Sequence, residues 1–520
     1  MDKKKTNPFV LVILDGWGIT KETRGNAVAL GNTPVIDTLM DNYPHSLLGA
    51  SGKDVGLPPG QDGNSEAGHL NIGAGRIVEQ ESVIISRSIN EGTFFRNPAF
   101  LAAIHHVKKN NSTLHLMGLI TDQQSAHADP DHLLALLTFA RLKNVHKVCL
   151  HLFTDGRDSY QFLAIKLLNK LKKILVNSEK IGTIIGRYYA MDRIKEWART
   201  KMAYEALVMG KGHQARDAQE AVLQAYNRHE NDEYIMPTVI NSDGQANGRI
   251  CDNDTVIFFN LRSDRVRELT KALVQPDFIG FKRDKVLKNL LMVTLTDFGP
   301  DLPGVLPAYP ARVLHDTLPA ALQGLRQLYI SETEKFAHVT YFINGGHDHT
   351  IAGESRIMVK SPTIPSYKDK PEMSADQLTD IIVKSIEQDK YDFILVNYPN
   401  PDMIGHTGDL AAGIKAVQKV DYCVGRLQNI IGKKDGTMIV IADHGNIEEM
   451  IDLETGQVDT SHSANPVPFI IFNKHISRDE AVKKGVLSDI APTIIHMMGR
   501  KKPREMGNKI LCRFQINQQS

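Results

Sequence analysis

The sequence predicts an α/β fold of two domains, with chemically active side chains placed at the ends of buried strands. Apolar runs of strand length alternate with helical stretches along the 520 residues, which is typical of α/β architecture. Two of these runs, residues 9–14 and 438–442, lead almost directly into Asp15 and Asp443. Open α/β sheets bind ligands at the carboxyl ends of their strands, so these two aspartates are candidates for one shared site.

The composition favours a cytoplasmic protein without a general affinity for nucleic acid or membranes. The 61 basic and 60 acidic residues nearly balance, so no general attraction to nucleic acid or membranes is expected. Residues 3–5 are lysines, but the apolar run after them is too short for a signal peptide, and no run reaches membrane-spanning length. The cysteines are scattered and are expected to be reduced thiols: Cys149, Cys251, Cys423 and Cys512.

Residues 61–69, between glycines, are predicted to form a loop that turns into a helix. Ser65 is then an N-cap or first-turn residue, with free backbone N–H groups nearby for a phosphate. On this segment alone a capping serine is the commoner interpretation. A neighbouring metal ion would lower the pKa of the hydroxyl and make Ser65 a nucleophile. His69 is interpreted as structural.

The middle of the chain has its own apolar runs, and arginines follow three of them. These arginines either form ordinary salt bridges in loops or bind phosphate and carboxylate groups in the bidentate geometry that suits guanidinium. The residues of interest are Arg157, Asp158, Arg187, Arg193, Arg262 and Arg265.

Further metal ligands follow the later apolar runs. Residues 393–396 lead into Asp402 and His406, whose spacing of four places them on one side of a helical turn. His444 adjoins Asp443, and His462 precedes a strand-like run at residues 467–472. Carboxylate and imidazole without thiolate suit Mn²⁺ or Zn²⁺. Six such side chains are too many for one tetrahedral ion, so two ions are expected: Asp15, Asp402, His406, Asp443, His444 and His462. A single strand-final aspartate would more often be a turn former.

Five segments together carry a family resemblance. They are residues 15–18 (Asp-Gly-Trp-Gly), 64–69 (Asn-Ser-Glu-Ala-Gly-His), 400–408, 442–446 and 461–468. In this order, along nearly the whole chain, they resemble cofactor-independent phosphoglycerate mutase of the alkaline phosphatase superfamily. The resemblance implies an alkaline-phosphatase-like core domain with an inserted α/β domain. It also implies that Asp402, His406 and His462 hold one metal ion, Mn²⁺ being expected, and that Asp15, Ser65, Asp443 and His444 hold the other.

The metal motifs lie before residue 76 and after residue 400, which predicts a discontinuous core domain. Residues 298–310 are predicted to be a linker rich in glycine and proline, and residues 72–76 a weaker joint. The expected domains are therefore residues 1–76 with 310–520, and an insert at 77–309. The resemblance implies that the insert closes over the substrate, with the two joints as hinges.

The resemblance also implies roles for residues that spacing alone leaves open. The six residues of the insert named above match substrate-binding positions, and Lys335 matches a lysine that faces the phosphate. His127 is aligned with a substrate-contacting histidine, although the loop at residues 123–129 departs from the family pattern by one extra residue and lacks its glycine pair. His347 and His349 are interpreted as loop residues, not metal ligands.

These inferences predict interconversion of 3-phosphoglycerate and 2-phosphoglycerate through a phosphoserine on Ser65. Lys335 and the arginines would neutralise charge, and Asp158 would transfer protons. The alternatives are a metal-dependent phosphatase or phosphodiesterase, an inactive metabolite-binding protein, and a phosphomutase acting on sugar phosphates. The resemblance suggests a monomer.

Overall fold

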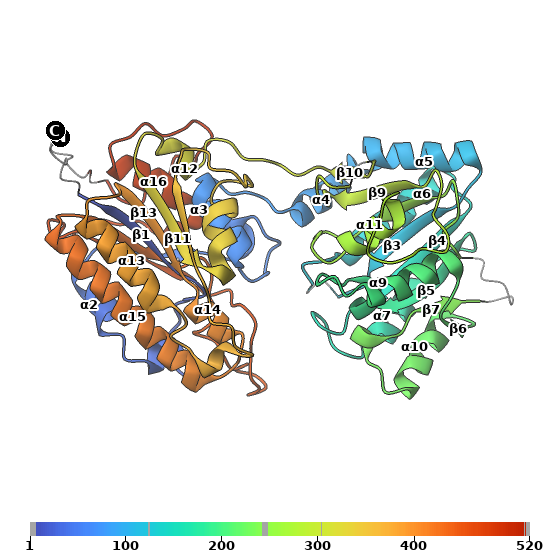
Figure 1. Cartoon of the computed structure of the whole chain (residues 1–520), viewed down its shortest axis with the longest axis horizontal. Coiled ribbons are helices and arrows are strands. Elements are labelled where there is room, and N and C mark those ends of the chain that lie inside the picture. Colours follow the sequence, from blue (N-terminus) through green and yellow to red (C-terminus); the bar gives the residue numbers. More distant parts are fainter. Residues whose placement is uncertain (1–6, 123–124, 242–247, 303, 514, 516–520) are drawn as a thin grey trace. The chain divides into compact units, whose positions relative to one another are not determined.

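The computed structural model describes residues 7–122, 125–241, 248–302, 304–513 and 515. The chain divides into two compact units. In Figure 1, one unit has the colours of the two ends of the sequence bar, and the other has the colours of its middle. The core unit comprises Met1–Gln80 and Arg312–Ser520, and the inserted unit comprises Glu81–Ala311. The sequence placed these boundaries at residues 76 and 310. No helix in the described ranges is long and apolar enough to cross a membrane.

The core unit is built on one mixed sheet with the order β12-β11-β13-β1-β14-β15-β2-β16. The strands β12, β11, β13, β1 and β14 run parallel, and β15 runs antiparallel to both of its neighbours. The bounds are β1 Phe9–Leu14, β2 His45–Gly49, β11 Gln327–Glu332, β12 Ser355–Val359, β13 Phe393–Tyr398, β14 Thr437–Ile441, β15 Val467–Phe472 and β16 Gly485–Val486.

The central strands of this sheet are buried along their whole length, which explains their continuous apolar sequence. One group of helices, α1, α2, α13, α14 and α15, packs together, and α3, α12 and α16 form another (Figure 1). The bounds are α1 Ala27–Leu30, α2 Pro34–Asn42, α3 Ser65–Ala74, α12 Leu318–Ala321, α13 Ala375–Glu387, α14 Asn400–Gly405, α15 Leu410–Lys433 and α16 Ile490–Met497.

The inserted unit has a second sheet, in the order β10-β9-β8-β3-β4-β5-β7-β6. All neighbouring pairs are parallel except β5 with β7. The bounds are β3 Leu114–Leu119, β4 Val148–Thr154, β5 Glu179–Gly186, β6 His213–Ala215, β7 Thr238–Ile240, β8 Thr255–Phe258, β9 Leu291–Thr296 and β10 Leu306–Tyr309. The prediction of two domains, each of the α/β class, is confirmed.

Apolar clusters lie on both faces of the inserted unit's sheet, because successive side chains of each strand alternate between the faces. Leu116 and Leu150 belong to one cluster, and Met117 and Phe153 to the other. The helices are α4 Glu81–Asn90, α5 Pro98–Asn110, α6 Pro130–Leu142, α7 Ala164–Lys172, α8 Arg187–Ala190, α9 Trp197–Tyr204, α10 Ala218–Asn227 and α11 Arg267–Val274.

The prediction that residues 298–310 form a linker is wrong for their last part. Leu306–Tyr309 is the edge strand β10, which pairs in parallel with β9. Proline at residue 307 suggested a break, but an edge strand tolerates proline because one side of its backbone needs no ladder partner. The weaker joint predicted at residues 72–76 overlaps the last turn of α3, which ends at Gly75 in the left-handed conformation.

Candidate active site

Parallel strands of the core unit deliver the candidate residues to one edge of the sheet. Asp15 follows β1 and Asp443 follows β14, two strands that pair directly. Asp402 lies in α14, just after β13, and Lys335 ends the short helix η5 (Thr333–Lys335), just after β11. Since these strands are parallel, their carboxyl ends meet, as the sequence predicted for the aspartates.

Ser65 is the first residue of α3, and its hydroxyl lies among charged groups. Asn64 is the N-cap, and its side chain accepts a hydrogen bond from Ala67 N. Ser65 Oγ is 2.6 Å from Lys335 Nζ, 2.8 Å from His444 Nε2 and 3.3 Å from Asp15 Oδ1. The cap is therefore Asn64, which leaves the Ser65 hydroxyl available for chemistry.

Asp402, His406 and His462 form one group of converging ligand atoms. Asp402 Oδ1 is 3.3 Å from Nε2 of each histidine, and the two Nε2 atoms are 3.1 Å apart. His406 Nδ1 and His462 Nδ1 lie 2.7 and 2.8 Å from the carbonyl oxygens of Thr460 and Gly63. A carbonyl only accepts, so each Nδ1 carries the proton of the neutral ring, and both Nε2 lone pairs face the carboxylate.

Asp15, Asp443 and His444 form a second group beside the first. His444 Nε2 is 3.6 Å from Asp15 Oδ1, 3.6 Å from Asp443 Oδ2 and 3.8 Å from Asp402 Oδ1. Asp443 Oδ1 accepts from Gly16 N, whereas Oδ2 is buried, forms no hydrogen bond in the described chain and lies 3.2 Å from His69 Nδ1, whose proton is directed to the Ser65 carbonyl oxygen. A buried carboxylate oxygen without a donor is costly unless a cation occupies the place of the donor.

Lys335 is the one ammonium group among these three carboxylates in the described chain. Its Nζ lies 2.7 Å from Asp15 Oδ1 and 2.6 Å from Asp402 Oδ2. Burial opposes its charge, but Asp15 and Asp402 outweigh burial and raise the pKa of Lys335 above its usual value. Burial and the neighbouring Asp443 raise the pKa of Asp15 to about 7, even though Lys335 acts in the opposite direction. One ammonium therefore does not satisfy the carboxylates.

The two groups fit divalent cations. Oxygen and imidazole ligands converge, the Nδ1 atoms of His406 and His462 are held by backbone carbonyls, and three carboxylates exceed the one ammonium of Lys335 in charge. Residues that the sequence placed in a metal site are thus brought together by the fold. This convergence supports the binding of divalent metal at this edge of the core sheet.

Several polar residues that support the site were not predicted from the sequence. Asn397 Nδ2 donates to Asp15 Oδ2 at 2.6 Å, and Asn446 Nδ2 donates to Asp402 Oδ1 at 3.2 Å. Buried Glu448 accepts from Gly18 N and Asn446 N and so ties two of the loops together. The available signal was Asn397 itself, a polar residue inside an otherwise apolar strand, β13.

His69, interpreted as structural, lies directly behind the site. Its Nδ1 is 2.9 Å from the Ser65 carbonyl oxygen and 3.2 Å from Asp443 Oδ2, and its Nε2 is 3.0 Å from Asn397 Nδ2. His69 thus holds the first turn of α3 against the strand-end carboxylate, which is a positioning role.

In the inserted unit, the strand ends gather arginines. Arg187, at the start of α8 after β5, is buried and pairs with Asp155 and with Asp158, the latter at 2.8 Å. Ser125 Oγ donates to Asp158 Oδ2 at 2.7 Å. Burial acts against the charge of Asp158, but Arg187 and the Ser125 hydrogen bond prevail and lower its pKa, so Asp158 is ionised.

The other arginines differ in how far carboxylates neutralise them. Arg193 lies 3.2 Å and Arg262 3.8 Å from Asp264, and Arg157 lies 3.5 Å from Glu233. For these residues the structure includes the salt bridges that the simpler interpretation expected.

Arg265 is different from its neighbours. It forms no hydrogen bond or ion pair within the described parts of the chain. Burial, together with Arg193, Arg187 and Arg157, lowers the pKa of Arg265 to about 10. A guanidinium that is crowded by other guanidinium groups is a suitable place for an anion.

His127 lies in the same unit and is buried beside these charges. Its Nδ1 is 4.0 Å from Asp264 Oδ1 and has no hydrogen-bond partner among the described residues. Burial and then Arg187 lower its pKa to about 4, so the ring is neutral. Gln123 and Gln124, in the loop that departs from the family pattern, lie outside the described residues. His347 and His349 lie in a loop, as predicted.

The candidate residues are thus gathered into two sets. Those for metal binding and nucleophilic attack, with Lys335, belong to the core unit, whereas Asp158, His127 and the arginines belong to the inserted unit. Each set is assembled by the strand ends of its own sheet.

Comparison with known proteins gives a consistent family. The model of the metalloenzyme superfamily matches residues 7–502. The 2,3-bisphosphoglycerate-independent phosphoglycerate mutase of Clostridium botulinum is 46% identical over 516 residues, covering 98% of this chain and 100% of the relative. The enzyme of the same description from Clostridium perfringens is 47% identical over 512 residues, covering 97% of this chain and 98% of the relative.

A solved structure agrees with the sequence comparisons. Leishmania mexicana phosphoglycerate mutase at low cobalt concentration matches with a TM-score of 0.79 and 29% sequence identity, covering 98% of each chain. The resemblance inferred from the five motifs is therefore confirmed. The chain belongs to the metalloenzyme superfamily and, within it, to the family of 2,3-bisphosphoglycerate-independent phosphoglycerate mutases.

Proposed function

We propose that this protein interconverts 3-phosphoglycerate and 2-phosphoglycerate, with Ser65 carrying the phosphoryl group between the two positions. The observation that supports this most directly is the surrounding of the Ser65 hydroxyl. Its oxygen is 2.6 Å from an ammonium nitrogen of Lys335 and 2.8 Å from His444 Nε2, beside two groups of cation ligands. Relatives that match this chain over nearly their whole length are named for this reaction.

We assign two divalent ions to the core unit, with Mn²⁺ expected. Asp402, His406 and His462 would hold one, and Asp15, Ser65, Asp443 and His444 the other. When bound, such ions neutralise charge on the transferring phosphoryl group and favour the deprotonated form of a serine hydroxyl.

The chain's own residues then perform the transfer. Ser65 releases its hydroxyl proton to solvent, and its Oγ forms a bond to phosphorus while the bond between phosphorus and the C3 oxygen of the substrate breaks. Lys335 Nζ, already 2.6 Å from Ser65 Oγ, would stabilise negative charge on the serine oxygen and on the phosphoryl group. The free C3 oxygen takes up a proton, and glycerate stays bound. The reverse sequence of steps on the C2 oxygen completes the isomerisation.

Asp158 is the proposed proton carrier for the glycerate oxygens. The lowered pKa keeps Asp158 ionised, as a proton acceptor must be, although it also weakens the base. Substrate anions that attract Arg187 away from Asp158 would restore some of that basicity.

The arginines of the inserted unit are proposed to retain the substrate. Arg265, crowded by other arginines, would bind an anionic group of phosphoglycerate, and Arg157, Arg187, Arg193 and Arg262 would contribute to the same field. His127 would add a neutral hydrogen-bonding ring. Bidentate guanidinium contacts suit both the carboxylate and the phosphate of this substrate.

Phosphorus NMR of the Mn²⁺-loaded protein with 3-phosphoglycerate, without added bisphosphoglycerate, tests the proposal. A growing 2-phosphoglycerate signal without free phosphate is expected. Free phosphate as the main product would assign a phosphatase that fails to retain the intermediate. No change in the spectrum, with metal bound, would overturn the enzymatic assignment in favour of a metabolite-binding protein.

Several further expectations stay predictions. They are the identity of the metal as Mn²⁺, a monomeric state, a cytoplasmic location, hinges near the unit boundaries, and the absence of nucleic-acid and membrane partners.

A further inference from the structure

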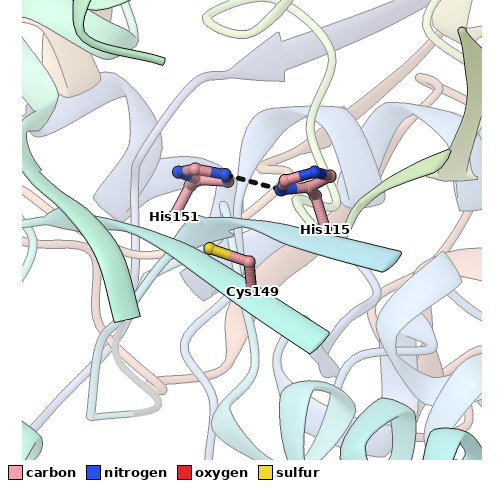
Figure 2. A group of neighbouring side chains, drawn as sticks. All are labelled: His115, Cys149 and His151. Carbon is pink, nitrogen blue, oxygen red and sulfur yellow. Dashed lines mark hydrogen bonds between the residues drawn. The ribbon is translucent and has the colours of Figure 1, made fainter. Parts of the chain in front are cut away.

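A separate cluster of potential metal ligands lies inside the inserted unit. His115 on β3 and Cys149 and His151 on β4 bring one ligand atom each to within 4.8 Å of one another (Figure 2). All three side chains are buried. His115 and Cys149 lie near the beginnings of their strands, whereas the arginines follow the strand ends, so the cluster is distinct from the proposed substrate-binding residues.

Strand register brings these residues together. His115 and Cys149 are direct partners in the parallel pairing of β3 with β4. Cys149 and His151 are two residues apart on one strand, so both side chains point to the same face of the sheet. The two imidazole rings are nearly parallel, with 21° between their planes. The convergence is therefore built into the two central strands.

The outer nitrogen of each ring is held by another polar group, and the inner nitrogens face each other. His115 Nε2 is 3.1 Å from Asp254 Oδ2, and His151 Nδ1 is 3.0 Å from Thr183 Oγ1. The inner atoms, His115 Nδ1 and His151 Nε2, are 2.9 Å apart. Outer-ring contacts of this kind, above all a carboxylate, orient the histidine ligands of protein metal sites.

We propose that His115 Nδ1, His151 Nε2 and Cys149 Sγ bind a divalent transition-metal ion, zinc by the chemistry of the donors. Imidazole nitrogen and thiolate are both ligands that zinc accepts, and this set is unlike the oxygen-rich groups of the core unit. Such an ion would join β3 to β4 and, through Asp254, to the start of β8.

The charges of the cluster also fit a divalent cation. Asp254 is buried and, within the described ranges, no lysine or arginine forms an ion pair with it. A divalent ion with one thiolate leaves a net charge of +1, which the Asp254 carboxylate cancels. A buried set of groups with no net charge avoids most of the penalty of an unpaired buried ion.

Binding would rearrange protons in a defined way. Without metal, the contacts are satisfied if Thr183 donates to His151 Nδ1, His151 Nε2–H donates to His115 Nδ1, and His115 Nε2–H donates to Asp254. With metal, the His151 proton moves to Nδ1 and is donated to Thr183 Oγ1, while the Cys149 thiol loses its proton to solvent. One proton is released for each ion bound.

A cavity lies beside the cluster, and Cys149 is one of the residues that line it. The cavity has a volume of about 570 Å³, and its lining also includes Lys147, Lys180 and Ile240. All of its lining residues belong to the inserted unit, so an ion that enters it would need to cross only the wall at Cys149 to reach the cluster.

Cobalt substitution in the full-length protein tests the proposal. The candidate ligands of the core unit include no cysteine, so a thiolate-to-cobalt charge-transfer band would not come from the core-unit metal site. We expect this band in the wild type and in Cys251→Ser, whose thiol is exposed, and its loss in Cys149→Ser. After dialysis against Zn²⁺ and then metal-free buffer, the wild type should keep one more zinc ion per chain than Cys149→Ser.

Two results would overturn the proposal. The first is a Co²⁺-loaded wild type that lacks the band, which is decisive even if Cys149→Ser does not fold. The second is a band that persists in Cys149→Ser. Either result would mean that no metal ion binds here, and that hydrogen bonds alone connect Asp254, His115, His151 and Thr183.

Discussion

The two sheets of this protein use the same geometry for opposite chemistry. At the strand ends of the core unit, Asp15, Asp402 and Asp443 are accompanied by a single ammonium, that of Lys335. At the strand ends of the inserted unit, arginines gather, and the pKa of Arg265 is lowered because burial and three arginines outweigh the one carboxylate nearby, Asp264. The topology of parallel strands selects the place, whereas the residue types after each strand select a cation or an anion as the ligand.

The pKa shifts at the two edges mirror each other. Burial and a second carboxylate raise the pKa of Asp15 to about 7, and burial and neighbouring guanidinium groups lower the pKa of Arg265 to about 10. In each case like charges are crowded, and a ligand of the opposite charge would relieve the crowding. The comparison therefore predicts that metal and substrate anion depend on different units.

The largest effect is expected from Ser65→Ala. Because this change removes the proposed nucleophile, mutase activity should fall by about 10³-fold or more, while metal content stays unchanged because Asp15, Asp443 and His444 still hold the second ion. Ser51→Ala is a matched control, since Ser51 Oγ contacts only the Ala464 carbonyl oxygen at 3.2 Å. Phosphorus NMR and metal analysis measure the two quantities. Substantial activity in Ser65→Ala would remove Ser65 from the mechanism and break the comparison at the core edge.

The second-largest effect is expected from low pH, which should weaken metal binding at the strand ends of the core unit. Only neutral imidazole binds metal, so protons compete with the ion as the pH falls. Burial lowers the pKa of His406, but the Asp402 carboxylate outweighs burial and raises this pKa above its usual value. Activity and metal content should decline together below about pH 6.5, by about tenfold or more per pH unit once protons compete. Rates and metal content measured from pH 8 to pH 5 test this. A flat profile with metal retained would contradict the histidine ligands.

The α/β class and much of the metal set could be predicted because their signals are local. Asp15 and Asp443 follow continuous apolar runs, and such runs form buried parallel strands with polar ends. Asp402 and His406 follow from a spacing of four, which α14 realises.

Other parts depended on contacts that no local pattern encodes. Lys335 follows a strand that is not among the apolar runs, and the family resemblance alone assigned its role. Asn397 lies within a buried strand, and its partner Asp15 comes just after the neighbouring strand β1. The strand β10 was missed because proline in a short segment has the same local pattern in a linker and in an edge strand.

Arg265→Lys should produce a moderate effect confined to the inserted edge. Lysine keeps the charge but not the two-pronged contact, so KM for 3-phosphoglycerate should rise by about 10- to 100-fold without loss of metal. Arg216→Lys is the control, because Arg216 is exposed and pairs with Glu220 at 3.1 Å. Steady-state kinetics with metal analysis separate the two edges. An unchanged KM in Arg265→Lys would mean that Arg265 is not part of the anion site.

The smallest effect concerns a crowded carboxyl pair that no ligand relieves. Burial raises the pKa of Glu268, in α11, to about 7, and the Asp192 carboxylate adds to this. Protonation of Glu268 relieves the repulsion between the two carboxyl groups, as a metal ion would do for the carboxylates of the core unit. The pKa of Glu268 is higher in the folded protein than the usual 4.5, so its contribution to stability is lost as the pH rises from about 4.5 to about 7.

Glu268→Gln resembles the protonated form, because its amide oxygen can still accept from Lys195 N and its amide nitrogen can donate to Asp192. As the pH rises from 5 to 8, the free energy of unfolding of this variant should increase by about 1 kcal/mol relative to that of the wild type. Glu220→Gln should show almost no change over this range, since the Arg216 hydrogen bond lowers the pKa of Glu220 and its titration lies below pH 5. Denaturant unfolding at both pH values tests the pair. Identical pH dependence in Glu268→Gln and wild type would show that Glu268 is ionised throughout, and that like charges in this unit are tolerated without a proton.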